Sequence, residues 1–211
     1  MSGCCDDGCS LDGLRERQRG TLQAVLGINA VMFFVIAAAA LHAGSSALLS
    51  DSLDNLGDAL TYGLSLYAVS RGAAAKARVA LFKGGLILLA ACVVFVQVGA
   101  KLAVPTVPAF GEMGIFSLIG LAANSICLYL LWRHRHEDVN MSSVWECSRN
   151  DIAVNLSVFV AAAGVWATGS GWPDIAVAAA LAALLMRSSM RVIASGRAEL
   201  ARSAPHPQDK P

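Results

Sequence analysis

The sequence predicts an all-α integral membrane protein, a bundle of six transmembrane helices with both termini on the cytoplasmic side. Three observations support this fold class. The 211 residues are 56% hydrophobic, with a mean hydropathy of +0.58, which is typical of membrane proteins. Apolar segments long enough to cross a bilayer, about 20 residues each, follow one another along the chain. Basic residues gather on alternate connections between these segments.

Six apolar segments have the length of a membrane span. They are Leu22–Leu41, Ala47–Val69, Val79–Ala103, Ile115–Trp132, Val144–Thr168 and Ile175–Ile193. The chain therefore divides into a Cys-containing tail (residues 1–20), a six-helix transmembrane domain (21–196) and a short tail (197–211). The N-terminus does not resemble a cleaved signal peptide, because its first twelve residues carry three acids and no base.

The distribution of Lys and Arg predicts the orientation of the bundle. Basic residues precede the first segment, surround the connections after the second and fourth, and follow the sixth; they are Arg15, Arg17, Arg19, Arg71, Lys76, Arg78, Arg133, Arg135, Arg197 and Arg202. The intervening connections, around 42–46, 104–114 and 169–172, contain no Lys or Arg. The positive-inside rule then places both termini in the cytoplasm. The expected location is the bacterial inner (plasma) membrane.

Three acids lie inside the second segment, at Asp51, Asp54 and Asp58. A carboxylate at the bilayer centre costs about 2.5–3.5 kcal/mol, so three within eight residues need partners, protons or a bound cation. Asp54 and Asp58 are four residues apart and share one helical face, close enough to hold a single ion. Asp51 lies on the same stripe, but it could equally cap the helix or lie at the membrane interface.

The fifth segment offers a matching pair, Cys147 and Asp151, with Asn155 one turn further along the same face. Two helices that each contribute an i, i+4 pair can surround one cation tetrahedrally. Carboxylates with a thiolate suit Zn²⁺ and softer ions of the Cd²⁺ kind, whereas Ca²⁺ or Mg²⁺ would require more oxygens and no sulfur. Cys147 could instead be a small buried hydrophobic residue.

The predicted metal ligands are Asp54, Asp58, Cys147 and Asp151, with Asp51 and Asn155 as accessory groups. Cys4, Cys5 and Cys9, beside two acids in the N-terminal tail, either bind metal loosely and pass it on or have no metal role. Asn29 and Asn124 are single amides within spans, for which hydrogen bonding between helices is the ordinary explanation.

Residues 44–58, Gly-Ser-Ser-Ala-Leu-Leu-Ser-Asp-Ser-Leu-Asp-Asn-Leu-Gly-Asp, closely resemble the second helix of the cation diffusion facilitator (cation efflux) family. That helix characteristically reads Gly-Ser, an apolar stretch, Asp-Ser, and then His/Asp-x-x-x-Asp. Asp54 and Asp58 match this ligand pair. In the fifth helix Asp151 matches the second ligand, and Cys147 stands where the family has His or Asp. Asp174 and Lys83-Gly84-Gly85 also look like this family, and the resemblance covers roughly residues 10–196.

The resemblance implies efflux of a divalent transition metal, Zn²⁺ or Cd²⁺ above all, by alternating access in exchange for protons. The metal is then transported substrate, and no resident cofactor is expected. Burial favours the protonated form of carboxyl and thiol groups, and metal binding displaces those protons. One set of residues can therefore carry protons and metal in turn.

Typical family members continue into a cytosolic metal-binding domain that assists dimerisation. This chain ends at Pro211, so we expect a short member that lacks the domain. That expectation neither requires nor excludes a homodimer. Besides the transported ions, the expected partner is the lipid bilayer.

Two rival functions remain. The first is a membrane-embedded metal-binding or sensing protein that does not transport. The second is an intramembrane aspartyl protease, suggested by Gly57-Asp58, but the Gly-x-Gly-Asp and Tyr-Asp motifs of those enzymes are absent. We therefore predict a protein that is not an enzyme. No nucleic-acid partner is expected, and no Gly-x-x-x-x-Gly-Lys-Ser/Thr motif indicates a pump driven by ATP.

Overall fold

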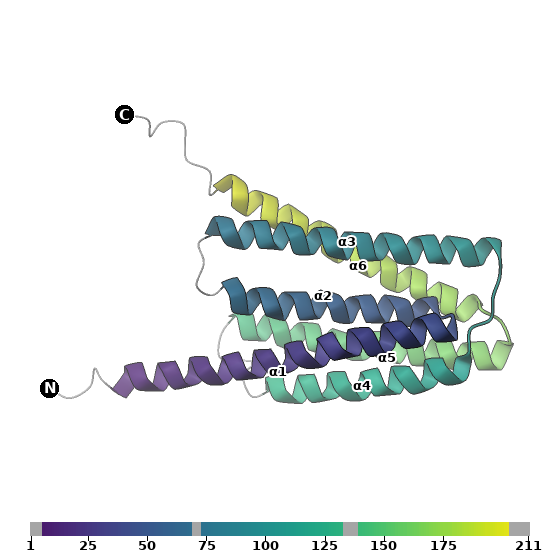
Figure 1. The fold of residues 1–211 in the computed structure, drawn as a ribbon, viewed down its shortest axis with the longest axis horizontal. Coiled ribbons are helices and arrows are strands. Elements are labelled where there is room, and N and C mark those ends of the chain that lie inside the picture. Colours follow the sequence, from purple (N-terminus) through teal and green to yellow (C-terminus); the bar gives the residue numbers. More distant parts are fainter. Residues whose placement is uncertain (1–5, 69–72, 133–138, 203–211) are drawn as a thin grey trace.

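The structure is a computed structural model that describes residues 6–68, 73–132 and 139–202. Within these ranges, side chains are described for 19–63, 66, 77–78, 80–132 and 149–202. The described residues form six α-helices and no strand (Figure 1). The helices are α1 (Asp6–Ala43), α2 (Ser46–Ala68), α3 (Ala73–Ala103), α4 (Phe110–Trp132), α5 (Val139–Thr168) and α6 (Trp172–Arg202). The predicted all-α bundle of six helices is confirmed.

Several helices extend further than the apolar segments. Helix α1 already begins at Asp6, so most of the segment predicted as an N-terminal tail continues the first helix. Helix α6 likewise runs on to Arg202. Once a helix has formed inside a membrane, adding residues requires no new nucleation, and the Leu, Arg, Glu and Gln residues at the start of α1 are good helix formers. Cys4 and Cys5 lie outside the described residues, as does the side chain of Cys9.

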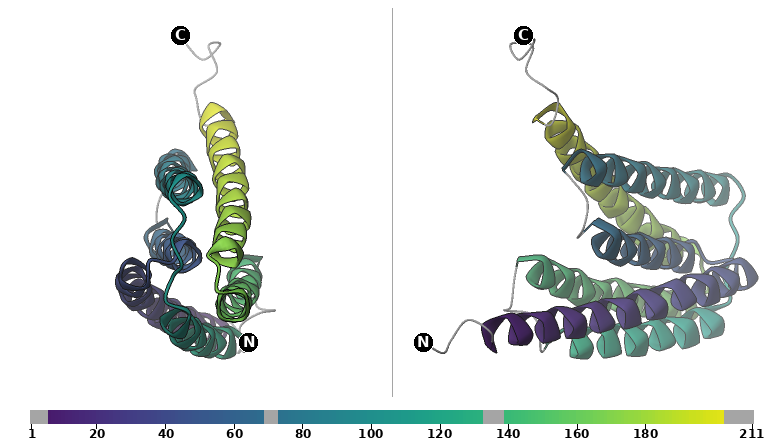
Figure 2. Two further views of the ribbon diagram at one scale, coloured as in Figure 1. Left: turned by 90° about the vertical axis from the view of Figure 1, so that its right-hand side faces the viewer. Right: turned by 60° about the vertical axis from the view of Figure 1, so that its left-hand side comes forward.

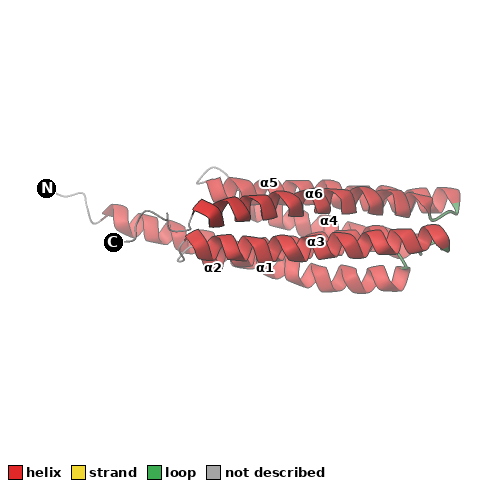
Figure 3. Ribbon diagram, turned by 90° about the horizontal axis from the view of Figure 1, so that it is seen from above, coloured by secondary structure: helices red, strands yellow, loops and turns green. Residues whose placement is uncertain are grey.

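Successive helices run in opposite directions (Figure 1), and seen from above they lie alongside one another (Figure 3). Helix α1 begins and α6 ends at the same end of the bundle, which we call the terminal end (Figure 1). The opposite end carries the connections after α1, α3 and α5. The first of these is short because Gly44 adopts a φ of 62° and reverses the chain within two residues.

Helix α2 is the centre of the bundle. The most extensive packing occurs in three pairs, α3 with α6, α1 with α2, and α4 with α5. Within the described residues, α2 is also the one helix that contacts all five others, whereas α3 contacts only α2 and α6. Figure 2 shows α2 between α3 on one side and α1 and α4 on the other. Any group on α2 can therefore be approached from several helices.

Five helices, all except α2, contain stretches long and apolar enough to cross a membrane. Helix α2 differs from the others because any 18-residue stretch of it contains three charged residues, Asp51, Asp54 and Asp58. Only about a third of each of the five spans is buried, and large apolar side chains point outward, such as Phe34 (70% exposed) and Val96 (73% exposed). Soluble monomers rarely expose such apolar faces. The described helices therefore form an integral membrane protein.

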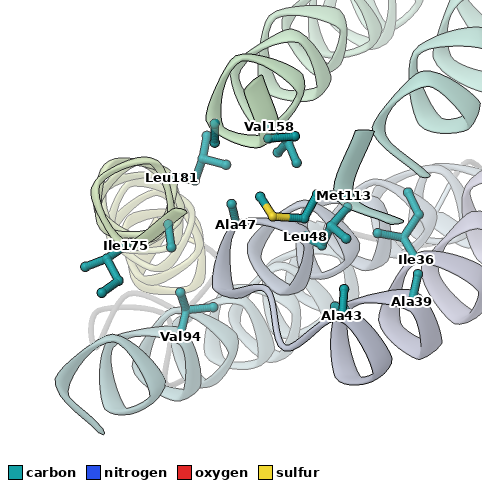
Figure 4. Close-up of a cluster of buried hydrophobic side chains, with 14 of the residues drawn as sticks. Ile36, Ala39, Ala43, Ala47, Leu48, Val94, Met113, Val158, Ile175 and Leu181 are labelled. Atoms are coloured by element: carbon teal, nitrogen blue, oxygen red, sulfur yellow. The ribbon is translucent and has the colours of Figure 1, made fainter. Parts of the chain in front are cut away.

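A dense apolar core occupies the bundle toward the opposite end (Figure 4). Ala43, Ala47 and Leu48 from the turn between α1 and α2 pack there against Met113 of α4 and Ile175 of α6. The alanines let the helices approach closely, which is how helices gain packing energy in lipid. This core fills the bundle between the acidic stretch of α2 and the opposite end.

Candidate metal site

The carboxyl groups of Asp58 on α2 and Asp151 on α5 form a hydrogen bond with each other. Asp151 is 7% exposed, and the hydroxyl of Tyr62 donates to Asp58 Oδ2 over 3.2 Å. Two carboxyl groups that are hydrogen-bonded to each other share a proton unless a cation lies between them. The structure thus brings together one member of each predicted ligand pair, from two different helices.

Asp54 lies one turn before Asp58, and its carboxyl group interacts electrostatically with both Asp58 and Asp51. The three acids form a continuous stripe, as their spacing predicts. Asp51 is 1% exposed, and its Oδ2 has no hydrogen-bond partner among the described residues. It does not cap a helix, because α2 begins at Ser46 and is capped by other groups.

Asn155 lies one turn beyond Asp151 and is fully buried. Its Nδ2 donates to the backbone oxygen of Asp151 over 2.9 Å. Its Oδ1 is directed at Gly120 of α4, where a Cβ atom would lie 2.0 Å away. Asn155 therefore shapes the contact between α5 and α4, and its predicted accessory role at the metal stays a prediction.

The side chain of Cys147 lies outside the described residues, although its backbone belongs to α5, one turn before Asp151. Among the side chains that are described, no three His, Cys, Asp or Glu groups lie close enough together to hold a metal ion. Three of the described acids form a stripe on α2, and the hydrogen bond of Asp58 joins this stripe to Asp151 on α5. Together they do not form a closed cage. The predicted four-ligand set stays a prediction.

The structure adds neighbours of Asp58 that the sequence did not indicate. Cys127 of α4 interacts electrostatically with Asp58, as does Lys83 of α3, whose Nζ also contacts Thr61 Oγ1 one turn along α2. Asp58 thus has partners from α3, α4 and α5. The i, i+4 spacing of Asp58 and Tyr62 could have identified the tyrosine, whereas the others depend on how the helices are rotated.

The predicted role of Asn29 in helix packing is confirmed. Its Nδ2 donates to the backbone oxygen of Val25 over 3.0 Å and lies 3.8 Å from Cys127 Sγ, which joins α1 to α4. For Asn124, by contrast, Oδ1 has no hydrogen-bond partner among the described residues.

A second polar centre holds the first turn of α2 at the opposite end of the bundle. Asp174 of α6 accepts hydrogen bonds from the backbone nitrogens of Ser46 (2.9 Å) and Ala47 (3.0 Å) and from Ser45 Oγ (2.6 Å). Ser45 Oγ in turn accepts from the backbone nitrogen of Leu48 over 3.1 Å. These bonds satisfy the free N–H groups at the start of α2, where a negative charge is favoured.

Lys101, near the end of α3, completes this centre. Its Nζ lies 2.8 Å from Asp174 Oδ2 and also contacts the backbone oxygen of Gly44. The Asp174 side chain is 0% exposed and that of Lys101 is 9% exposed. The sequence indicated Asp174 only through the family resemblance. Its structural effect is to fix the start of the helix that carries the acidic stripe.

The profile of the family described as the cation efflux transmembrane domain matches residues 22–201. No curated protein matches the chain in a separate comparison. The matched region spans all six helices, including the acidic stripe of α2 and the Asp174 centre. Members of this family are transporters and not enzymes. With the membrane-spanning bundle and the meeting of acids from α2 and α5, this match establishes that the chain belongs to the cation efflux family of membrane transporters.

Proposed function

We propose that the protein exports a divalent transition-metal cation, Zn²⁺ or Cd²⁺, from the cytoplasm in exchange for protons, through a site between α2 and α5. The observation that carries this proposal is the hydrogen bond between the Asp58 and Asp151 carboxyl groups, which joins the two helices inside the membrane. In a family of cation transporters, buried acids that face one another across two helices are the natural ligands for the cargo.

The ligand set follows from the same pair. Asp54 lies one turn from Asp58, and Cys147 precedes Asp151 by one turn of α5. Together these four residues offer three carboxylates and one thiolate. That composition suits Zn²⁺ and Cd²⁺ better than hard cations. In a lipid environment the four groups must come together around the ion during binding, because the described acids do not form a closed cage.

Proton exchange follows from the charge at this site. A carboxyl pair in low dielectric holds a proton when no cation lies between its oxygens. A divalent ion that binds there replaces the proton, because metal ligands must be deprotonated. Release of the metal on the far side of the membrane then lets protons return. The same atoms can therefore couple metal export to proton import without a separate proton path.

Alternating access is supported by the unequal ends of the bundle. The acidic stripe is separated from the opposite end by the apolar core and by the Asp174 centre. The basic residues near the terminal end favour a cytoplasmic location for that end under the positive-inside rule. The closed end would then face outward, and metal would enter from the cytoplasm. Export requires a second state in which α2 and its neighbours repack to open the closed end.

Flux measurements in proteoliposomes with a pH gradient test this function. Asp58→Asn and Asp151→Asn keep the size of each side chain but remove a negative charge, so transport of Zn²⁺ and Cd²⁺ should fall to background while insertion and folding persist. Glu199→Gln is the matched control, since Glu199 pairs with Arg202 at the exposed end of α6. Unchanged flux in both aspartate variants would contradict the proposed site. Metal binding with no flux in the unmodified chain would identify a binding protein instead.

A further inference from the structure

A groove of about 370 Å³ lies between α1 and α4 near the opposite end of the bundle, where the end of α1 lies beside the start of α4 (Figure 1). Six side chains line it: Val35, Ala38, Ala39 and His42 of α1, with Glu112 and Phe116 of α4. The spacing of the first four places them on one face of α1, and the last two are one turn apart on α4. A volume of this size is typical of sites for organic molecules and is far larger than a single ion needs.

The two ends of this groove differ in polarity. His42 is in the last turn of α1 and Glu112 is in the first turn of α4, close to the ends of the two membrane spans Arg19–Ala43 and Phe110–Trp132. In a bilayer such positions lie near the level of the lipid headgroups. The other lining residues are apolar and lie one to two turns deeper, beside side chains that face outward, such as Phe34 (70% exposed). The groove is therefore polar at the membrane surface and apolar below it, as a phospholipid is.

The carboxyl group of Glu112 has one oxygen that the described residues leave unsatisfied. Its Oε1 lies 3.5 Å from Nε2 of His42, whereas its Oε2 is buried and has no hydrogen-bond partner among those residues. The helix dipoles favour an acid at the start of α4 and a histidine at the end of α1, but they provide no donor for Oε2. A buried acceptor without a donor is costly. None of the six lining residues is Lys or Arg, so a cationic N–H group from another molecule is the complementary partner.

We propose that this groove binds one molecule of phosphatidylethanolamine, with its ammonium group donating to Glu112 Oε2 and one acyl chain lying along Val35 and Phe116. A primary ammonium carries three N–H donors, as in a lysine side chain, whereas the quaternary nitrogen of phosphatidylcholine carries none. A lipid with an anionic headgroup and no amine would place negative charge beside the carboxylate. The exposed imidazole of His42 lies where it can donate to the lipid phosphate.

A lipid fits the groove better than a metal ion does. Nε2 of His42 and Oε1 of Glu112 are close enough to contact one cation, but they are only two ligands. Among the side chains that the structure describes, no three His, Cys, Asp or Glu groups gather to hold a metal. Two polar residues at one end of a largely apolar groove suit an amphiphilic molecule. The proposal is independent of metal transport, because the groove shares no residue with the site between α2 and α5.

The first experiment reconstitutes the full-length chain in vesicles that contain phosphatidylethanolamine and phosphatidylcholine in equal amounts, with identical acyl chains. The protein is then extracted in mild detergent, and the lipid that stays bound is identified by native mass spectrometry. We expect the unmodified chain to retain phosphatidylethanolamine about 10-fold over phosphatidylcholine, the size expected of one hydrogen bond to a charged group. Equal retention would show that any membrane lipid fills the groove, and it would overturn the proposal.

Three variants test the assignment of the two ends. Glu112→Gln keeps the size of the side chain but removes its charge, so the preference for phosphatidylethanolamine should disappear. Glu199→Gln is the matched control, since Glu199 pairs with Arg202 at the exposed end of α6, and it should leave the preference unchanged. Ala38→Phe fills the apolar part of the groove and should reduce the retention of both lipids. A preference that survives Glu112→Gln would contradict the placement of the ammonium group.

A further measurement uses only the unmodified chain and so does not depend on the folding of any variant. Phosphatidylethanolamine with one or two methyl groups on its nitrogen keeps at least one N–H donor, and the third methyl group removes the last. Retention should therefore persist for the first two lipids and fall at phosphatidylcholine. A steady decline with each added methyl group would show that headgroup size decides, which is contrary to the proposal.

Other occupants of the groove give different results. If Glu112→Gln weakens Zn²⁺ binding while the unmodified chain retains both lipids equally, the pair of His42 and Glu112 is a cation site and the lipid proposal is wrong. If the unmodified chain is a dimer that Ala38→Phe dissociates, the groove is an interface between two copies, and the proposal is again wrong. Neither result bears on transport through Asp58 and Asp151, which the flux of the aspartate variants decides.

Discussion

At the scale of single residues, Gly120 and Asn155 determine how closely α4 and α5 approach. The Asn155 side chain is wholly buried and occupies the space that a Cβ atom at position 120 would need. Small residues at such crossings allow two backbones to come near each other in lipid. Because Asn155 is one turn from Asp151, this crossing also fixes how α5 presents its acid to α2.

Gly120→Ala should therefore destabilise the protein by about 1–3 kcal/mol, the usual cost of overpacking. The added methyl group would collide with Asn155 Oδ1. The midpoint of thermal unfolding in detergent measures the effect. Adding Asn155→Ala should recover part of the loss, because it removes the colliding atom. Gly114→Ala on the same helix, where a Cβ atom would meet nothing within 4 Å, is the control.

The sequence could predict which acids share a helical face. It could not predict which side chains of other helices interact with them. The spacing of Asp54, Asp58 and Asp151 is set by helix geometry, which is local and holds in any helix. The electrostatic interactions of Cys127 and Lys83 with Asp58 depend on how α3 and α4 are rotated about their axes. That rotation is decided by packing over the whole bundle. The role of Gly120 depends on the same long-range contacts.

At the scale of helices, α2 is held at its first turn by Asp174 of α6 and Lys101 of α3. The fixed end lies away from Asp54 and Asp58. Because it holds α2 in place, it determines the position of these acids along the bundle axis. A buried ion pair of this kind contributes little net stability compared with an apolar pair, but breaking it leaves a charge without a partner. Its consequence is the placement of α2 relative to α3 and α6.

Asp174→Ala should cost about 3–5 kcal/mol of stability, because Lys101 is left buried without its counter-ion and α2 loses its cap. The double variant Asp174→Asn with Lys101→Met should be more stable than Asp174→Ala, since it leaves neither charge and retains an acceptor for the α2 backbone. Thermal unfolding of the three proteins in detergent checks the order. A double variant as unstable as Asp174→Ala would contradict the assignment of the loss to an uncompensated charge.

At the scale of the whole molecule, five apolar helices surround one that carries three acids. The count and order of the helices could be predicted from the sequence, because the spans are long and apolar and basic residues gather on alternate connections between them. The residues at which the helices end could not be predicted. Helices α1 and α6 continue through polar sequence such as residues 6–20 and 197–202, where hydropathy no longer marks them.

The orientation of the bundle is a separate prediction. A reporter that is active only in the cytoplasm should work when fused before Met1 and also when fused after Pro211, because the positive-inside rule predicts a cytoplasmic location for both termini. The same reporter inserted between Val104 and Pro108, in the connection after α3, should be silent. Reporter activity measured in intact cells decides the matter. Opposite results at the two termini would contradict an even number of spans.

The acids of α2 also bear on how the protein is made. A helix with three carboxylates at membrane depth pays about 2.5–3.5 kcal/mol for each charged group when it faces lipid alone, so α2 is poorly suited to leave the insertion machinery by itself. Its extensive contact with α1 suggests a route in which the two helices partition together as a hairpin. Helix α2, which carries the proposed metal ligands, would then need α1 for its insertion into the membrane. Variants that weaken the α1–α2 contact should therefore be degraded in the cell.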